Sequence, residues 1–322
     1  MKHISILPLY DATIHSIDSA YQLFNRVNDF MRYQGRPALY EVSIVGDRKE
    51  TVLSGGVYRV TADKTIDEIQ KTDIIILPLL CGGFDKAIEQ NQVYTDWIVK
   101  QRAVAEIVCL CSGSFYLAST GLLDGKKCAV HWGALRDFQN RFPNVISVGD
   151  QIITDEDGIY TCAGNFSYLS LLIYIIEKHA GRETAILAAK MFQIEMDRKT
   201  QAPFAILTAN KMHGDHNILE VQTWIETNPR EPFTIDSICE KFSFGKRTFE
   251  RRFKKLTGNS LLEYAQRVRV EQVKRELESS RKTINEIVQQ AGYNDVDAFR
   301  RLFKKYTTLT PFEYRKKYNP GE

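Results

Sequence analysis

The chain has 322 residues, of which 43% are hydrophobic and 26% charged, as in an ordinary globular protein, and it is long enough for two domains. No apolar run reaches the length of a membrane span, and the first residues are too polar for a signal peptide, so we expect a cytoplasmic location without a membrane partner. Residues 211–322 carry 22 Lys and Arg against 16 Asp and Glu, whereas residues 1–210 carry 21 against 24. This imbalance suggests a polyanionic partner for the basic part, although many basic faces are merely solvated.

Short apolar segments alternate with amphipathic stretches up to about residue 195. The predicted strands cover residues 3–9, 40–46, 73–79, 106–110 and 158–164. The predicted helical stretches cover residues 17–34, 85–102, 113–120 and 166–179. Such alternation predicts an α/β domain, a flavodoxin-like sandwich around a mainly parallel sheet. Ligands bind beyond the carboxyl ends of the strands in such sheets, which here means residues 78–83, 111–113 and 163–165.

The stretch EIVCLCSGSFYLAS, residues 106–119, has the layout of a nucleophile elbow, a tight turn between a strand and a helix. Cys111 stands at the turn and is followed by Ser112 and Gly113. The start of the following helix would favour a thiolate at Cys111. Cys111 is therefore a nucleophile, a residue that lines a ligand pocket, or a structural or redox-reactive thiol, and the sequence leaves these alternatives open.

Two further residues are candidates for the same site. His131 is the best candidate partner of Cys111, and otherwise a partly buried histidine with its hydrogen bonds satisfied. Asn165 follows a predicted strand and could contact a ligand or cap a helix. The other cysteines lie mostly in apolar segments without the spacing of a zinc site, so we expect reduced thiols and no metal or cofactor.

From about residue 217 the strand signal disappears and helical periodicity takes over, after a polar segment, 211–217, that reads as part of a linker. This region contains an internal repeat: TIDSICEKFSFGKRTFERRFKK is matched about fifty residues later by TINEIVQQAGYNDVDAFRRLFKK. Each copy predicts a short helix (235–242 and 284–291), a tight turn and a second helix, and a long amphipathic stretch, 261–278, joins the copies. A short helix, a tight turn and a second helix form a helix-turn-helix.

Each second helix has an apolar side and a mostly basic side. The apolar sides carry Phe249 and Phe253 in the first copy, and Phe299 and Phe303 in the second. The opposite sides present Lys246, Arg247, Glu250, Arg251 and Lys254, and Asp297, Ala298, Arg300, Arg301 and Lys304. Helices of this kind enter the major groove of DNA, where Arg and Lys neutralise phosphates and Arg can read guanine. The alternative is a helical bundle with a solvated basic face.

Residues 222–318 resemble the DNA-binding domain of the AraC/XylS family of transcription regulators. The resemblance is carried by Trp224, Arg247, Phe249, Arg251, Phe253, Gly258, Tyr264, Arg269, Ile287, Gly292, Tyr293, Phe299, Phe303, Pro311 and Tyr314. It implies that six positions face DNA bases: Arg247, Glu250, Arg251, Val296, Asp297 and Arg301. Two residues depart from the family pattern, since Gly245 replaces the usual capping Ser or Thr and Asp297 a frequent Ser. Asp297 is either a specificity element that accepts from cytosine or a helix-start residue favoured by the helix dipole.

The first 205 residues or so resemble the DJ-1/PfpI branch of the class I glutamine-amidotransferase-like fold, and more closely the sensor half of GlxA-type AraC regulators. The motifs that carry the resemblance are LCSG (110–113), GLLDGKKCAVHW (121–132), RFPNV (141–145), TCAGN (161–165) and QAPF (201–204). The catalytic parts are incomplete: Ser112 replaces the histidine of protease-type members. His15 and Ser16 stand near the place where DJ-1-like proteins carry an acid, with Asp11 and Asp18 only nearby. The usual Pro-Gly-Gly is PLLCGG, which alters the oxyanion hole or shifts it to Gly82 and Gly83.

We therefore predict a non-enzymatic transcription regulator, by family habit an activator. A sensor and dimerisation domain covers residues 1–205, a linker 206–217, and a DNA-binding domain 218–322. The expected partners are promoter DNA, a small-molecule effector bound near Cys111, Ser112, Gly113, His131 and Asn165, a second copy of the chain, and RNA polymerase. The rival prediction is a hydrolase or deglycase-like enzyme that uses Cys111.

Overall fold

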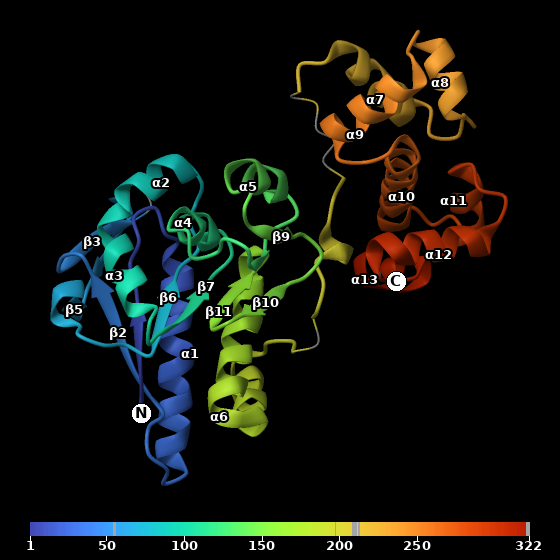
Figure 1. Cartoon of the computed structure of the whole chain (residues 1–322). Helices are drawn as coiled ribbons and strands as arrows, with labels where there is room; N and C mark the ends of the chain where they lie inside the picture. Colours follow the sequence, from blue (N-terminus) through green and yellow to red (C-terminus); the bar gives the residue numbers. More distant parts are fainter. Residues whose placement is uncertain (54–55, 197, 208–210, 212, 320–322) are drawn as a thin grey trace. The chain divides into compact units, whose positions relative to one another are not determined.

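The computed structural model describes residues 1–53, 56–196, 198–207, 211 and 213–319 (Figure 1). Internal contacts divide the chain into two compact units, Met1–Gln201 and Ala202–Glu322. Part of the predicted linker, residues 208–210 and 212, lies outside the described residues. Within the described part of the chain, none of the helices has the length and apolar character that a membrane crossing requires.

The N-terminal unit is built on a seven-stranded sheet with the order β10-β11-β7-β6-β1-β2-β5. Its strands are β1 (Lys2–Ile6), β2 (Tyr40–Gly46), β5 (Lys64–Thr65), β6 (Ile74–Leu77), β7 (Glu106–Cys109), β10 (Ile153–Glu156) and β11 (Ile159–Cys162). All neighbours pair in parallel except β10 and β11. Two small sheets, β3 (Glu50–Leu53) with β4 (Tyr58–Thr61) and β8 (Lys127–Ala129) with β9 (Ile146–Val148), complete the unit. This arrangement confirms the predicted α/β class.

The helices show where the sheet changes its winding direction. They are α1 (Ile14–Tyr33), α2 (Phe84–Gln90), α3 (Thr95–Gln101), α4 (Gly113–Ser119), α5 (Leu135–Arg141) and α6 (Tyr168–Phe192), with short turns η2 (Ile66–Glu68), η3 (Gln92–Tyr94) and η4 (Asn165–Ser167). From β1 the chain passes through α1 to β2, whereas from β6 it passes through α2 and α3 to β7 on the other side. The neighbouring strands β1 and β6 therefore flank the topological switch point of the sheet. Right-handed crossovers place α1 and α2 on opposite faces, and α6 packs beside α1 (Figure 1).

The central strands are buried on both faces, which explains why their sequences are continuous apolar runs. All four residues of β6, with the sequence IIIL, are buried, as are those of β11. The predicted helical stretch 85–102 is two helices instead of one, because the buried Asn91 ends α2 and its amide binds the backbone of Tyr10 and Ala87. The predicted stretch 166–179 is also too short: α6 continues to Phe192 across a break at Gly181, where φ is 83°.

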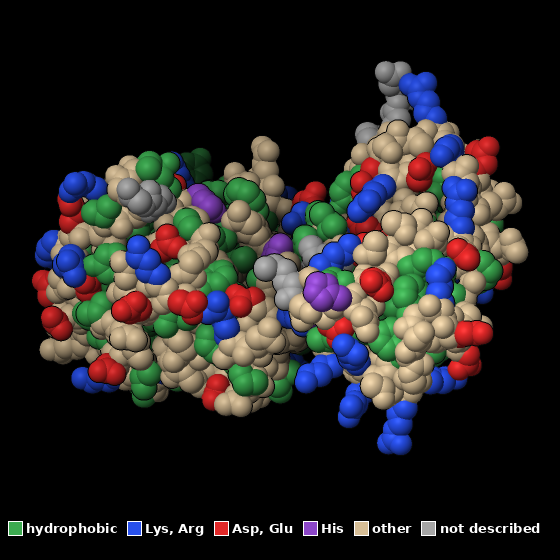
Figure 2. Space-filling model, turned by 90° about the horizontal axis from the view of Figure 1, so that it is seen from above, with side chains coloured by type: hydrophobic (Ala, Val, Ile, Leu, Met, Phe, Trp, Pro, Cys, Tyr) green, Lys and Arg blue, Asp and Glu red, His purple; other side chains and the backbone are tan. Residues whose placement is uncertain are grey.

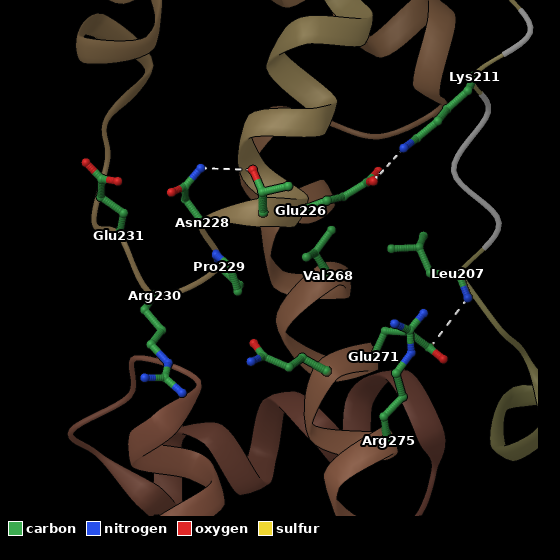
Figure 3. Close-up of a pocket in the computed structure, with 12 residues that line it drawn as sticks. Leu207, Lys211, Glu226, Asn228, Pro229, Arg230, Glu231, Val268, Glu271 and Arg275 are labelled. Carbon is green, nitrogen blue, oxygen red and sulfur yellow. Dashed lines mark hydrogen bonds and ion pairs between the residues drawn. The ribbon is translucent and has the colours of Figure 1, made fainter.

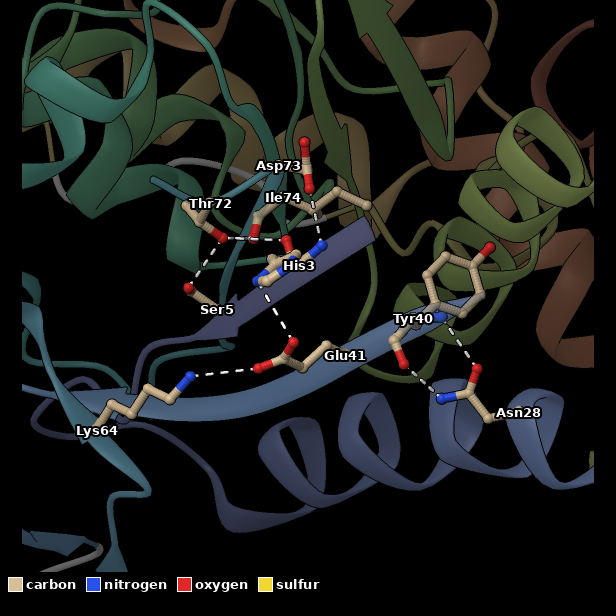
Figure 4. A network of polar contacts seen from close by, with 9 residues as sticks. All are labelled: His3, Ser5, Asn28, Tyr40, Glu41, Lys64, Thr72, Asp73 and Ile74. Atoms are coloured by element: carbon tan, nitrogen blue, oxygen red, sulfur yellow. Dashed lines mark hydrogen bonds and ion pairs between the residues drawn. The ribbon is translucent and has the colours of Figure 1, made fainter. Parts of the chain in front are cut away.

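A closed polar network holds the amino-terminal edge of the sheet (Figure 4). The Thr72 hydroxyl donates to the carbonyl of His3 and accepts from Ser5, and the His3 N–H donates to Asp73. Beside it, the buried Asn28 accepts the N–H of Tyr40 at 3.0 Å and donates to its carbonyl at 2.7 Å. These groups satisfy one another, so this edge has a structural role, in contrast to the carboxyl edge that carries the candidate site.

The C-terminal unit is all-helical. Its helices are α7 (His216–Thr227), α8 (Ile235–Lys241), α9 (Lys246–Thr257), α10 (Leu261–Ser279), α11 (Ile284–Gln290), α12 (Val296–Thr307) and α13 (Pro311–Tyr318), preceded by the turn η5 (Ala202–Phe204). Capping boxes start four of them, with Thr234, Ser260, Thr283 and Thr310 as N-cap residues. The order confirms the predicted repeat: α8 and α9 form the first helix-turn-helix, and α11 and α12 form the second.

The two helix-turn-helix motifs have separate cores that are joined along α10. The amino-terminal half of α10 packs with α7, α8 and α9, and its carboxyl-terminal half packs with α11, α12 and α13. The cores repeat the same geometry: the ring of Phe253 meets Tyr264 at 5.5 Å and 90°, and the ring of Phe303 meets Tyr314 at 5.4 Å and 86°. Because α10 contributes to both cores, it fixes the spacing of the two motifs.

The two copies of the repeat differ in the residue that follows the second helix, and the backbone conformation there is less favourable in the second copy. The residue that ends α9 is Gly258, with φ of 76°, whereas its counterpart at the end of α12 is Thr308, with φ of 63°. A β-branched residue is unfavourable in this left-handed conformation. We expect Thr308→Gly to raise the free energy of unfolding by about 0.5–1 kcal/mol, and the reciprocal Gly258→Thr to lower it by a similar amount. Urea denaturation of the two variants tests this, and a loss of stability in Thr308→Gly would contradict it.

Candidate nucleic-acid interface and sensor site

The first candidate recognition helix, α9, separates its apolar and basic sides completely. Phe249 and Phe253 are fully buried in the first core. The predicted contact residues Lys246, Arg247, Glu250, Arg251 and Lys254 are all exposed. The helix begins after Gly245, which has no side chain and therefore gives no side-chain cap to the backbone N–H groups of the first turn.

The second candidate recognition helix, α12, has the same division. Phe299 and Phe303 are fully buried in the second core. Asp297, Arg300, Arg301 and Lys304 are exposed, and Val296 is half-buried. Unlike α9, this helix has a side-chain cap, since Asp295 accepts the N–H of Ala298 at 2.9 Å. The cap is therefore Asp295, and Asp297 occupies the first turn without capping it.

Two of the basic residues predicted to contact DNA already pair with a carboxylate, and three arginines do not. Lys246 pairs with Asp236 at 2.7 Å, and Arg300 pairs with Asp297 at 2.9 Å. By contrast, Arg247, Arg251 and Arg301 make no hydrogen bond or ion pair with the residues that the structure describes. Arg251 and Arg301 occupy equivalent positions, each two residues after the first core Phe of its helix. Figure 2 shows Lys and Arg side chains, in blue, projecting from the C-terminal unit.

At the elbow, Cys111 follows β7 and adopts a φ of 47°, the left-handed conformation that a nucleophile elbow imposes. Its side chain is only 9% exposed. Burial raises the pKa of the Cys111 thiol, although hydrogen bonds from the backbone N–H groups of Gly164 and Ser112 oppose this effect. A thiol with a raised pKa is mostly protonated near neutral pH, which disfavours it as a nucleophile.

The two residues after Cys111 have structural roles. The Ser112 hydroxyl donates to the carbonyl of Leu80 at 2.7 Å and accepts its N–H at 3.0 Å, so it links the elbow to the loop after β6. Gly113 is needed for close packing, because a Cβ at this position would lie 2.5 Å from the carbonyl oxygen of Pro78.

His131 is not positioned by Cys111. Its Nδ1 accepts the N–H of Gly133 at 3.1 Å, and no hydrogen bond joins it to Cys111 in the described part of the chain. Burial lowers the pKa of His131, which keeps the imidazole neutral. Ser16, near which the resemblance places the acid of DJ-1-like proteins, is buried, and its hydroxyl donates to the carbonyl of Thr13.

Asn165 lies at the same sheet edge, but it is not a helix cap. The N-cap of η4 is Gly164, and no side-chain cap is present there. Asn165 instead meets Nε2 of His15 at 3.3 Å, next to the exposed ring of Phe166, which lies 5.5 Å from the His15 ring. Of the five predicted ligand residues, the structure gathers Cys111, Ser112 and Gly113 at the elbow, and it connects Asn165 to His15.

A feature that the sequence reading missed is a segment we call the strap, residues 202–207, which lies on the C-terminal unit. The Ala205 carbonyl accepts from Nζ of the buried Lys274 at 2.6 Å, and the Pro203 carbonyl accepts from Tyr318 at 3.0 Å. Lys274 also pairs with Glu271 at 2.9 Å, and Glu271 accepts the N–H of Leu207. The signal in the sequence that could have revealed these contacts is a charged residue, Lys274, on the buried side of α10.

Next to the strap lies a cavity of about 950 Å³, bounded by α10 and the loop after α7 (Figure 3). Glu226 pairs there with Lys211 at 2.7 Å, and Arg230 and Arg275 carry the remaining positive charges (Figure 3). The cavity is therefore a polar space within the C-terminal unit, lined by residues of both charges.

Comparison with known proteins identifies both units. A helix-turn-helix domain model matches residues 238–317, and a DJ-1/PfpI family model matches residues 20–178. The chain is 30% identical to the multiple antibiotic resistance protein MarA of Escherichia coli over 107 residues, which cover 33% of this chain and 82% of MarA. The chain belongs to the AraC/XylS family of transcription regulators.

This regulator also resembles full-length relatives with the same two halves. It is 24% identical to the HTH-type transcriptional regulator GbdR of Pseudomonas aeruginosa over 98% of this chain and 84% of GbdR. It is 24% identical to the HTH-type transcriptional regulator GlxA of Rhizobium meliloti over 65% of this chain and 64% of GlxA. The solved structure of Drosophila melanogaster DJ-1beta shares the fold, with a TM-score of 0.51 and 19% identity over 60% of this chain and 98% of that chain. The regulator therefore binds DNA and carries a DJ-1/PfpI-like domain.

Proposed function

We propose that the regulator reads a specific promoter sequence through α9 and α12 and activates transcription there. The observation that carries this proposal is the set of exposed arginines without a protein partner, Arg247, Arg251 and Arg301, on two matched helices. An arginine that is free of intramolecular pairing can bind guanine or phosphate without first losing another interaction. The neighbouring Lys246 and Arg300 each pair with a carboxylate. They suit contacts with the phosphate backbone of DNA, which position the protein and do not read bases.

Replacing Arg247, Arg251 or Arg301 by alanine tests base reading. On a DNA site selected by the full-length protein, we expect each variant to lose about 1–3 kcal/mol of binding free energy and to relax base choice at one position. Fluorescence anisotropy on the selected site and on random DNA measures both effects. Arg26→Ala on the exposed side of α1 is the matched control, because it removes the same charge from the other unit. Equal losses on selected and random DNA would show that the arginines contact only phosphates.

We further propose that the DJ-1/PfpI-like unit acts by binding a small-molecule effector and not by catalysis. The buried, protonated thiol of Cys111, the separate hydrogen bonding of His131 and the serine at position 16 support this proposal. Assays of amide, ester and α-oxoaldehyde substrates test it: turnover that disappears in Cys111→Ala would establish the enzymatic alternative.

The active form that we propose is a homodimer that contacts paired DNA sites and RNA polymerase. Linking two DNA-binding units raises their effective concentration at paired sites, so that one duplex holds both more tightly than either alone. Sedimentation of the full-length protein, free and on DNA with one or two sites, distinguishes a dimer from independently bound monomers.

A further inference from the structure

The two helix-turn-helix motifs meet at a second place outside α10, where the loop after α7 lies against the turn between α11 and α12. The loop carries Pro229, Arg230 and Glu231 (Figure 3). A Cβ at Gly292 in the turn would lie 3.3 Å from both the Cα and the carbonyl oxygen of Arg230. Two bodies that are joined only by one helix can twist about it or bend with it, whereas a second contact away from the helix axis restricts both movements.

Arg269 of α10 contacts both the loop of the first motif and the turn of the second. Its Nε donates to the carbonyl of Pro229 at 2.6 Å, and Nη2 donates to the carbonyl of Glu231 at 3.4 Å. The guanidinium also lies over the ring of Tyr293, 5.5 Å from the ring centre. An arginine suits this place because its planar group donates hydrogen bonds from its edge while its face stacks on an aromatic ring. One side chain therefore bridges the two motifs.

The second copy of the repeat shows which contact is special to Arg269. The corresponding residue, fifty positions later, is Asn319. Its side-chain amide donates to the carbonyls of Leu277 and Ser280, so it holds the loop after α10 as Arg269 holds the loop after α7. A short amide is therefore sufficient to hold a loop of this kind. The longer arginine adds the contact that crosses to the other motif, its stacking on Tyr293.

The turn of the second motif is also adapted to this contact. Gly292 follows α11 with φ of 84°, and its counterpart after α8 in the first copy is Ser243, with φ of 56°. The left-handed turn itself therefore accepts a residue with a side chain. At position 292 a side chain would press against the backbone of Arg230. The close approach of the first motif thus explains the glycine in the second.

We infer that Arg269 is a positioning residue that holds the two recognition helices in the mutual orientation required by a DNA site of fixed spacing. The inference rests on the proposed reading of one promoter site through α9 and α12. Both helices bind one duplex together only if their separation and relative angle match successive turns of the major groove. A bridge that fixes the orientation before binding removes the cost of ordering the two motifs on the DNA. Arg269 acts through the loop and the turn, without touching a base.

The first test compares Arg269→Lys with Arg267→Lys in the full-length protein. Both changes keep the positive charge, so the long-range attraction to DNA is unaltered, but lysine lacks the planar group that bonds two carbonyls and stacks on a ring. Arg267 is the matched control because it lies on the same helix, with its guanidinium 5.2 Å from the ring of Tyr306 in the second motif. Among the described residues, however, it makes no hydrogen bond to the loop after α7.

Fluorescence anisotropy measures the affinity of each protein for three duplexes. They are the selected site, the same site with one base pair inserted between the bases read by α9 and those read by α12, and a half-site in which the α12 bases are randomised. The alanine variants of Arg251 and Arg301 assign these bases to the two helices.

We expect the parent protein to bind the selected site more tightly than the site with the insertion. Arg269→Lys should bind the selected site about fivefold more weakly, since hydrogen bonds of the bridge are lost, and the half-site as tightly as the parent does. The penalty for the insertion should therefore shrink in Arg269→Lys and stay unchanged in Arg267→Lys. An equal loss on the half-site would show that Arg269 serves the fold of the first motif, and would overturn the inference.

A second variant approaches the bridge from the other motif. Gly292→Ser gives the second copy the residue of the first and pushes the turn away from Arg230. It should weaken binding to the selected site and spare binding to a half-site that keeps only the α9 bases. Ser243→Gly, which removes a side chain from the equivalent turn, should leave both affinities unchanged. Full discrimination against the insertion in both Arg269→Lys and Gly292→Ser overturns the inference.

The same duplexes separate this inference from the proposed function. A parent protein that tolerates the inserted base pair without loss would overturn the inference, whereas its base preference within each half would still support the proposed function. A parent that binds selected and random DNA equally would contradict both, because a fixed orientation would then have no site to match.

Discussion

Replacing Phe303 by alanine is expected to lower the free energy of unfolding of the second helix-turn-helix by about 3–5 kcal/mol, because the side chain is fully buried and its loss leaves a cavity. The ring packs against Phe299 at 6.0 Å and meets Tyr314 edge-on at 5.4 Å. A loss of this size is comparable with the total stability of many small domains. The second recognition helix, α12, should therefore lose its fixed orientation. Arg301 would then no longer be held in a position equivalent to that of Arg251 on α9.

The separate cores make this prediction local. Hydrogen exchange of the full-length protein should show lost protection in α11, α12 and α13, while α8 and α9 keep theirs. Phe253→Ala should produce the reverse pattern, since Phe253 occupies the equivalent place in the first core. Phe312→Ala is the matched control: its ring is 67% exposed, so the same change should cost less than about 0.5 kcal/mol. Loss of protection across both motifs in Phe303→Ala would mean that the two cores unfold as one.

The C-terminal unit was predictable because its elements are determined locally. A capping Thr or Ser, a short apolar helix, a turn and two Phe residues four apart appear twice in the sequence and give the same structure twice. The pairing state of the basic residues was predictable only in part. Arg300 pairs with Asp297 at the i, i+3 spacing of one helix, whereas Lys246 pairs with Asp236 of the preceding helix, a contact that helical periodicity does not encode.

The N-terminal unit was predictable in class but less so in detail. The buried strands have clear apolar runs, whereas the short strands β3, β4 and β8 have mixed sequences that give little strand signal. β3 and β4 pair with each other as a hairpin, and β8 pairs with β9 across α5. The elbow was recognised from its residues, but the burial of Cys111 and the use of the Ser112 hydroxyl by Leu80 follow from tertiary packing.

Replacing Lys274 by methionine is expected to lower the free energy of unfolding by about 3–5 kcal/mol, because it removes one partner of a buried ion pair. Methionine preserves the length and most of the volume of the lysine side chain, so the change removes charge without creating a large cavity. Two groups lose their donor: Glu271, whose side chain is 14% exposed, and the carbonyl of Ala205 in the strap. A carboxylate that is mostly buried and has lost its counter-charge is the main source of the expected cost.

Lys282, which follows the carboxyl end of α10, supplies the matched control. It pairs with Glu276 at 2.9 Å, the same separation as in the Lys274–Glu271 pair, but its side chain is 42% exposed instead of 4%. Lys282→Met should therefore cost less than about 1 kcal/mol, since water replaces the lost partner. Urea denaturation of the two variants compares two ion pairs of equal length that differ in burial. Equal losses of unfolding free energy would show that burial does not determine the contribution of Lys274 to stability.

The strap is where the change at Lys274 should be visible first. Its contacts with α10 pass through Lys274 and Glu271, which hold the Ala205 carbonyl and the Leu207 N–H, and Tyr318 of α13 holds Pro203 separately. In Lys274→Met, hydrogen exchange at Leu207 should become fast while the amides of α9 and α12 stay protected. The double variant Lys274→Met/Glu271→Leu should recover much of the stability, because it removes the stranded carboxylate as well. Failure of the double variant to recover stability would assign the loss to the strap carbonyl instead of to the unpaired charge.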